Sequence, residues 1–152
     1  MEKHLTVREQ RAVFRALRIL ETHFKAPEVK ICSPAESRDY LRLRFAGNVR
    51  EELHILWLNS QNRLIEAETM FVGTLTETAV YPREIVRAAL KHNAAAIILA
   101  HNHPSGEATP SAADVALTGA VKKALALVDV RLLDHFIVTE CETTSLAEAG
   151  HV

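Results

Sequence analysis

Two histidines one residue apart, followed by a serine and an aspartate, are the residues whose types and spacing point most directly to chemistry. His101 and His103 flank Asn102, and Ser111 and Asp114 follow within the next eleven positions. Residues i and i+2 of a strand point to the same side, so we expect both imidazoles to project together from the end of a strand. Two neutral imidazoles and one carboxylate, with a fourth position open, form a ligand set typical of catalytic zinc. The spacing therefore predicts a single zinc ion per chain, held by His101, His103 and Asp114.

Asp114 also belongs to the apolar stripe of a predicted helix, three residues before Leu117. Removing an unpaired carboxylate from water costs several kcal/mol at least, so a cation or strong donors should face it. Ser-x-x-Asp before an apolar run is also the pattern of a capping box, in which Ser111 and Asp114 are purely structural. We favour the metal interpretation because Thr109 and Pro110 form a helix-start signal of their own. A cap at Thr109 leaves Asp114 inside the helix, too far along for capping.

The elements that must position these residues are helices alternating with strand-like runs. Apolar periodicity predicts a helix from Thr6 to about Lys25, and the pair Ser33 and Pro34 opens a second helix that runs through Leu43. Their order with the remaining elements predicts a mixed central sheet flanked by helices, an α/β or α+β layered domain. Those remaining elements are strands at 51–58 and 64–72 joined as a hairpin, a helix after Pro82, a buried strand at 95–100, a loop at 101–110, a helix from Thr109 to about Leu127, and a strand at 131–139.

Length and composition limit the class of protein. A chain of 152 residues leaves room for one compact domain, so we expect the N-terminal amphipathic helix, residues 1–30, to be part of the same unit as residues 31–152. Hydrophobic residues make up 48% and charged residues 24%, which excludes a disordered or fibrous protein. The formal net charge is -1, so only a local patch could attract nucleic-acid phosphates. The arginines of the first helix, from Arg8 to Arg18, are the candidate patch.

Apolar run length, the N-terminal pattern and the cysteines indicate the cellular compartment and whether the protein associates with a membrane. The longest apolar run, residues 94–100, is seven residues, far short of a membrane span. The N-terminus lacks the pattern of a secretory signal. Cys32 and Cys141 form no CxxC pair, which excludes a disulfide framework and a thiolate zinc site. We therefore expect a cytoplasmic protein without membrane contact.

The pattern His101-x-His103-x7-Ser111-x2-Asp114 resembles the JAMM motif of MPN/JAB-domain metalloproteins. The longer string HNHPSGEATPSAADVALT is similar to the RadC-like branch of that family. The resemblance extends to the predicted hairpin, to the segment YPRE that begins at Tyr81 and to the segment LDHF that begins at Leu133, and so covers about residues 33–150. It implies an MPN/JAB-like fold, with the layered architecture also found in cytidine deaminases.

The resemblance also implies roles for individual residues. The two histidines and Asp114 correspond to zinc ligands, and a glutamate upstream corresponds to the general base that acts on a water molecule. Glu51 stands two residues before Leu53, as the family pattern requires, but Glu52 remains the alternative because neighbouring strand residues point to opposite faces. Ser111 corresponds to the serine that donates to a developing oxyanion, a contribution typically worth about 3 to 4 kcal/mol.

Two further histidines, His135 and His54, could have either a chemical or a structural role. His135 follows Asp134, and this pair resembles the DH pair of the family. A packing or supporting role for His135 is as plausible as a chemical one. His54 alternates with Leu53 and Ile55 in a predicted strand, and we interpret it as structural.

Three hypotheses follow for function. The first is a zinc-dependent hydrolase of the JAMM type, a metallopeptidase or isopeptidase acting on an unidentified peptide or protein. The second is a nucleic-acid-binding or accessory protein associated with DNA repair, suggested by the name of the RadC-like family and by the arginine stripe. It predicts binding that weakens steeply with salt. The third is an MPN-like scaffold whose metal is structural.

Overall fold

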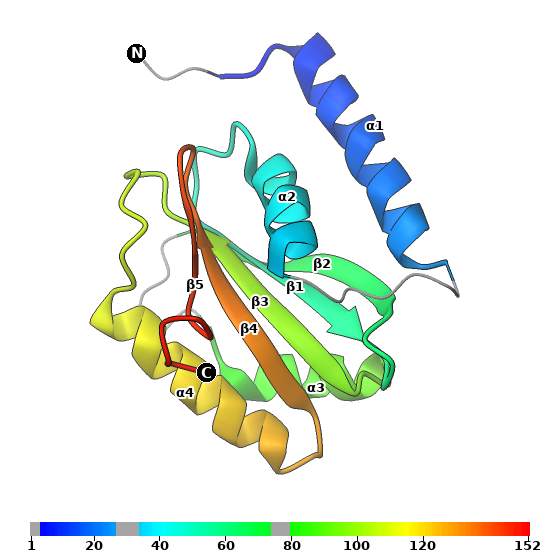
Figure 1. The fold of residues 1–152 in the computed structure, drawn as a ribbon, viewed down its shortest axis with the longest axis vertical. Helices are drawn as coiled ribbons and strands as arrows, with labels where there is room; N and C mark the ends of the chain where they lie inside the picture. The colour runs from blue at the N-terminus through cyan, green and yellow to red at the C-terminus, as the bar shows by residue number, and fades with distance from the viewer. Residues whose placement is uncertain (1–3, 27–33, 74–79) are drawn as a thin grey trace.

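The computed structural model describes residues 4–26, 34–73 and 80–152. A five-stranded mixed sheet forms its centre, and helices cover both faces of that sheet (Figure 1). This architecture confirms the predicted fold class. The helices are α1 (Val7–Phe24), α2 (Pro34–Phe45), α3 (Pro82–Lys91) and α4 (Ala112–Ala126). The strands are β1 (Glu52–Leu58), β2 (Leu64–Val72), β3 (Ala96–Asn102), β4 (Arg131–Val138) and β5 (Thr143–Ser145).

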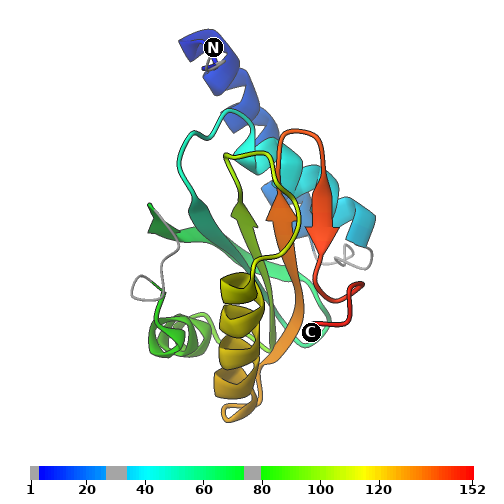
Figure 2. The same cartoon turned by 90° about the vertical axis from the view of Figure 1, so that its left-hand side faces the viewer.

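The sheet has the strand order β2-β1-β3-β4-β5. β1 is antiparallel to both β2 and β3, β3 is parallel to β4, and β5 is antiparallel to β4. Helix α4 connects the two parallel strands, and Figure 2 shows it against the sheet with the loop from β3 entering at its start. Ligands of open α/β sheets bind beyond the carboxyl ends of such strands. The predicted zinc ligands lie at that end of β3.

Strand alternation divides the core into two layers. Leu53, Ile55 and Trp57 of β1 pack with residues of α3 and α4. Leu56 and Leu58 pack on the opposite face, with residues of α1 and α2. Odd-numbered residues of β1 therefore face α3 and α4, and the even-numbered Leu56 and Leu58 face α1 and α2.

Helix α1 is held to the rest of the molecule by polar and apolar contacts. Phe24 is buried in the core on the α2 side of the sheet. The Tyr40 hydroxyl donates to the Glu21 carboxylate at 2.8 Å, and Lys25 forms an ion pair with Glu66 of β2 at 3.1 Å. The predicted boundary between residues 30 and 31 lies outside the described residues.

The predicted start of the last long helix was wrong. The helix begins at Ala112, and Ser111, not Thr109, is its N-cap. The Ser111 hydroxyl accepts from the Asp114 N–H at 3.1 Å, and the Asp114 carboxylate accepts from the Ser111 N–H at 2.7 Å. This capping box satisfies two backbone donors reciprocally, which a cap at Thr109 would not do.

The other helices and strands agree with their predicted bounds apart from small differences. The buried strand extends through His101 to Asn102, beyond the predicted end, and the short β5 was not predicted. Ser33 and Cys32 lie outside the described residues, and Cys141 is an exposed free thiol. Within the described ranges, no helix combines the length and apolarity needed to cross a bilayer.

Candidate metal centre

The structure brings His101, His103 and Asp114 together at the carboxyl end of β3. The Nε2 atoms of the two histidines are 2.8 Å apart. One carboxylate oxygen of Asp114 lies 3.1 Å from Nε2 of His101, and the other lies 3.5 Å from Nε2 of His103. The His101 side chain is fully buried and those of Asp114 and His103 are 7% and 13% exposed. Three potential ligand atoms therefore converge in a space largely closed to solvent.

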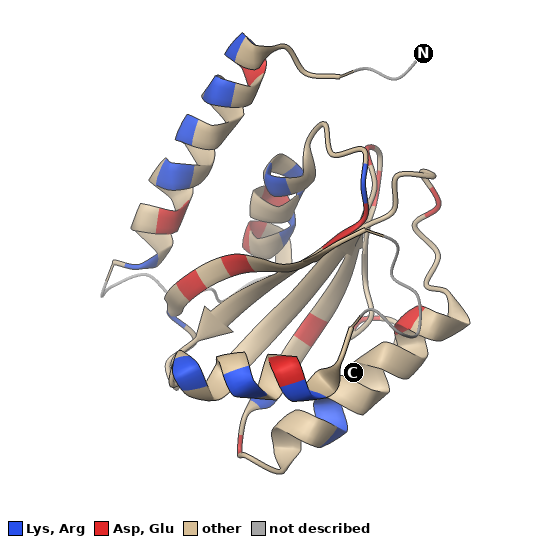
Figure 3. Ribbon diagram, turned by 180° about the vertical axis from the view of Figure 1, so that it is seen from behind, with Lys and Arg blue, Asp and Glu red and all other residues tan. Residues whose placement is uncertain are grey.

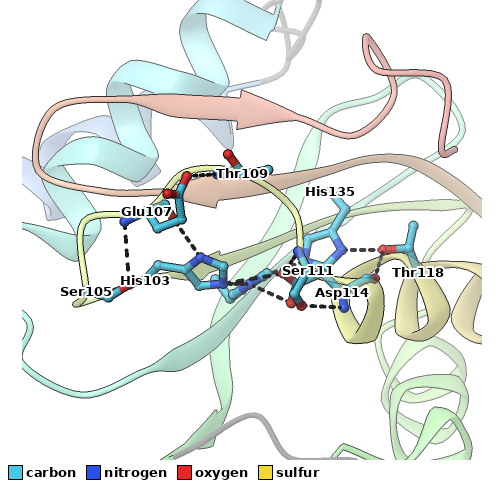
Figure 4. A network of polar contacts seen from close by, with 9 residues as sticks. His103, Ser105, Glu107, Thr109, Ser111, Asp114, Thr118 and His135 are labelled. Atoms are coloured by element: carbon cyan, nitrogen blue, oxygen red, sulfur yellow. Dashed lines mark hydrogen bonds and ion pairs between the residues drawn. The ribbon is translucent and has the colours of Figure 1, made fainter.

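The hydrogen bonds around His103 leave Nε2 facing this space as an acceptor. Its other nitrogen, Nδ1, lies 2.7 Å from the backbone carbonyl oxygen of Glu107. A carbonyl oxygen only accepts, so Nδ1 carries the proton of a neutral ring and Nε2 presents its lone pair. Figure 4 shows the His103 ring held between Glu107 on one side and Asp114 on the other.

This arrangement fits a metal ion. Lone pairs on two imidazoles and a carboxylate repel one another at these distances unless a proton or a metal ion lies among them. Tetrahedral zinc with bonds of about 2.0 to 2.1 Å holds its ligand atoms about 3.3 Å apart, close to the separations of 2.8 to 3.5 Å in the structure. These three residues form the only metal-compatible group of three or more His, Cys, Asp or Glu side chains that the described part of the chain contains.

The pKa values of Asp114 and His103 also indicate that the cluster favours a bound positive charge. Burial alone raises the pKa of Asp114, but the adjacent His101 and His103 rings outweigh burial and hold that pKa well below its ordinary value. The hydrogen bond to Asp114 raises the pKa of His103, with a smaller contribution from the charge of Glu51. Without a metal, the cluster therefore retains a proton more strongly than free imidazole does.

Asp114 has the structural role and the candidate ligand role at once. One oxygen accepts the Ser111 N–H of the capping box and the other faces His101. The N-terminus of α4 stabilises negative charge at this position. The two interpretations weighed for the Ser-x-x-Asp pattern are therefore compatible, since the cap holds the carboxylate where a metal would need it.

Glu51 and Glu52 are separated by strand alternation. Glu51 precedes Leu53 by two residues and so shares the face of the sheet that carries His101, whose register partner is Leu53. Glu52 lies on the other face and forms an ion pair with Arg44 of α2 at 3.3 Å. Only Glu51 therefore lies on the same face as the cluster.

Asn102, between the two histidines, holds the backbone on both sides of Glu51. Its side-chain oxygen accepts from the Glu52 N–H at 2.8 Å, and its amide nitrogen donates to the Arg50 carbonyl at 2.8 Å. Asn102 is buried, so water does not compete for these bonds. No role was predicted for this residue, although its position between two candidate ligands was an available signal.

Ser111 is exposed at the rim of the cluster. Its hydroxyl oxygen accepts from the Asp114 N–H, so the capping box does not use the hydroxyl proton. That proton is available to a ligand.

His135 lies against the cluster, and His54 does not. His135 is fully buried, its Nε2 lies 2.8 Å from Nδ1 of His101, and burial lowers its pKa well below the ordinary value. His54 is on the opposite face, where its Nε2 contacts the Tyr40 hydroxyl at 3.1 Å. Thr118 of α4, which contacts His135 at 2.6 Å, was not among the predicted site residues. It lies one helical turn after Asp114, on the same buried stripe, and that spacing was the signal.

Comparisons with known proteins identify the family of this chain. The family model described as RadC-like JAB domain matches residues 31–151. UPF0758 protein YeeS of Escherichia coli strain K12 is 49% identical over 146 residues, covering 96% of this chain and 99% of the relative. A UPF0758 protein of Chromobacterium violaceum is 58% identical over 120 residues, and one of Dechloromonas aromatica is 59% identical over 119 residues. These two alignments cover 79% and 78% of this chain and about half of each relative, 54% and 53%. The chain therefore belongs to the RadC-like JAB domain family.

Proposed function

We propose that this protein is a zinc-dependent hydrolase of the JAMM type that cleaves a peptide or isopeptide bond. The observation that supports the proposal is the convergence of two imidazole Nε2 atoms and a carboxylate, on the face of the sheet that Glu51 shares. Three protein ligands with an open fourth position are typical of catalytic rather than structural zinc. When bound, zinc supplies a Lewis acid that polarises a carbonyl and lowers the pKa of a water molecule to about 7.

Each remaining group has a role that its position supports. Glu51 takes a proton from the attacking water and transfers it to the leaving amine. Asn102 holds the backbone of Glu51 in place through the Arg50 carbonyl and the Glu52 N–H. Ser111 donates its free hydroxyl proton to the oxygen on which negative charge develops. His101, His103 and Asp114 hold the metal.

The metal content of the purified protein tests this proposal. We expect one zinc per chain by elemental analysis of protein prepared without added metal. We expect His101→Ala and Asp114→Asn to lose it, with an affinity loss above about 100-fold because each removes a direct ligand. Asn retains a side-chain oxygen that can accept the Ser111 N–H, so the second variant keeps the cap and removes only the charge.

His23→Ala is the control for this measurement, because His23 is exposed on α1 and takes no part in the cluster. It should retain zinc at the wild-type level. A wild-type protein that binds no zinc even when zinc is supplied would refute the proposal, and so would variants that keep it.

A second candidate function, nucleic-acid binding, is favoured by the outer face of α1. Arg8, Arg11, Arg15 and Arg18 are all exposed and recur at spacings of three, four and three residues, which aligns them along one side of a helix. Blue bands mark α1 along most of its length in Figure 3. Ten residues at 1.5 Å rise place Arg8 and Arg18 about 15 Å apart, a length suited to several phosphates.

Salt dependence tests this candidate. If all four arginines contact phosphates, the logarithm of the affinity for duplex DNA should fall with the logarithm of salt concentration at a slope of about -3.6. Arg11→Gln should make that slope shallower by about one, while Arg87→Gln on α3, where Arg87 pairs with Glu84, should not. Fluorescence anisotropy of a labelled duplex at several salt concentrations measures both. Undetectable or salt-insensitive binding would reject this function.

A further inference from the structure

A buried chain of three hydrogen bonds links the backbone of Asp114 to the ring of His101. The Thr118 hydroxyl lies 2.7 Å from the Asp114 carbonyl oxygen and 2.6 Å from Nδ1 of His135. Nε2 of His135 lies 2.8 Å from Nδ1 of His101. Thr118, His135 and His101 are each fully buried. Figure 4 shows the sequence of contacts from Asp114 through Thr118 to the His135 ring.

The directions of these bonds follow from counting protons. Each of the three contacts is short enough to need one proton between its two atoms. The Asp114 carbonyl supplies none, while Thr118 and each neutral imidazole supply one. The Thr118 proton must therefore point to the carbonyl, the His135 proton on Nδ1 to Thr118, and the His101 proton on Nδ1 to His135. Full burial of the His135 ring favours the neutral form that this count requires.

The end of the chain is the Nε2 atom of His101. With its proton on Nδ1, a neutral His101 presents a bare lone pair on Nε2, 2.8 Å from Nε2 of His103. The opposite order would put a proton on Nε2, in the space where a metal must bind. It would also set the Thr118 and Asp114 oxygens 2.7 Å apart with no proton between them.

We propose that Thr118 and His135 are positioning residues that set the tautomer and orientation of His101, so that Nε2 is ready to bind metal before the metal arrives. The hydrogen-bond chain begins at Asp114, which is itself a candidate ligand, so one network anchors ligands from both β3 and α4. Partners of this kind behind a metal-binding histidine are typically worth 10- to 100-fold in metal affinity. The inference rests on the metal site of the proposed function.

The first test uses the metal-free protein and needs no variant. Nitrogen-15 NMR of the histidine rings at pH 8 reports which ring nitrogen carries the proton. We expect the Nδ1–H tautomer for both His101 and His135. A Nε2–H tautomer of either ring in the metal-free protein would overturn the inference, whether or not zinc binds. The predicted tautomers in a protein that never binds zinc would support the hydrogen-bond order and refute the metal site alone.

The second test measures zinc affinity by competition with a chromophoric chelator. Thr118→Val keeps the shape of the side chain and removes the hydroxyl, so we expect a 10- to 100-fold loss of zinc affinity and a mixture of His101 tautomers by NMR. Thr118→Ser restores the hydroxyl and should recover wild-type behaviour in both measurements. A Thr118→Val protein with wild-type zinc affinity and unchanged tautomers would contradict the inference.

Thr69→Val is the matched control. Thr69 faces the buried His54 on the opposite side of the sheet, with its hydroxyl 3.3 Å from Nδ1 of that ring. Its replacement removes a threonine-histidine contact, together with a hydrogen bond from Arg44, without touching the cluster. Zinc affinity should be unchanged in this variant, while urea unfolding measures the stability change in both valine variants. Equal losses of zinc affinity in the two would assign the effect to stability and reject the positioning role.

Discussion

Glu51→Gln is expected to lower the turnover of a peptide substrate by about 10²- to 10⁴-fold, the usual contribution of a general base, while the zinc content remains at one ion per chain. Glutamine has nearly the same shape as glutamate and cannot accept a proton at neutral pH. The backbone contacts that Asn102 makes on either side of position 51 do not involve the side chain that changes. The variant should therefore keep the fold and the metal and lose the chemistry.

Glu52→Gln is the matched control, one residue along the same strand. It removes the ion pair with Arg44 on the opposite face, so a small loss of stability is expected with turnover near that of the wild type. The peptides from a digest of an unrelated protein are a suitable substrate mixture. Mass spectrometry counts the new amino termini that the enzyme creates, which measures its turnover. Equal loss of activity in both variants would remove the base role from Glu51. A zinc-loaded wild type that cleaves neither this mixture nor lysine-branched peptides would refute the hydrolase proposal and leave the metal site standing.

The overall architecture could be predicted because it depends on short-range periodicity. The run at residues 96–100 is apolar throughout and is buried on both faces, while α1 and α4 carry their apolar residues at helical spacing. The His-x-His spacing predicted the convergence of two rings for the same local reason. Local pattern was insufficient at Ser111, where two helix-start signals lay two residues apart and the capping box prevailed over the proline.

The choice between Glu51 and Glu52 needed long-range information. Glu51 immediately precedes β1 and Glu52 is its first residue, and alternation alone says only that they point to opposite faces. The pairing of Leu53 with His101 assigns one face to the metal cluster, and the contact of Glu52 with Arg44 assigns the other. The contact of Thr118 with His135 and those of Asn102 with Arg50 and Glu52 needed the same information, because these partners are 17 and about 50 residues away in the chain.

The stability of the protein is expected to fall as the pH drops below about 6.5, and His54 is expected to account for a large part of the loss. His54 is almost fully buried, between β1, β2 and α2. Its burial, assisted by the charge of Arg44, lowers its pKa to about 3. The groups that face it are the Tyr40 and Thr69 hydroxyls and Arg44, with Glu21 beyond Tyr40.

The direction of the effect follows from proton binding in the two states. In the unfolded chain the ring takes up a proton near pH 6.5, while in the folded protein it stays neutral down to about pH 3. Between these values the unfolded state binds more protons, so lowering the pH favours unfolding. The stability that His54 contributes is complete above pH 6.5 and declines by about 1.4 kcal/mol per pH unit below it. The expected loss is about 2 kcal/mol at pH 5.

His54→Gln isolates this contribution. Glutamine can hydrogen-bond to Tyr40 and Thr69 but does not titrate, so the free energy of unfolding in urea should fall by about 2 kcal/mol less between pH 7.5 and pH 5 than in the wild type. The comparison uses metal-free protein, in which His135 is common to both chains and its titration cancels in the difference. An overall destabilisation of the variant does not affect this difference of slopes. Parallel profiles for the two proteins would mean that the His54 ring binds its proton equally well in both states, and that the network joining α1 and α2 to the sheet is open to water.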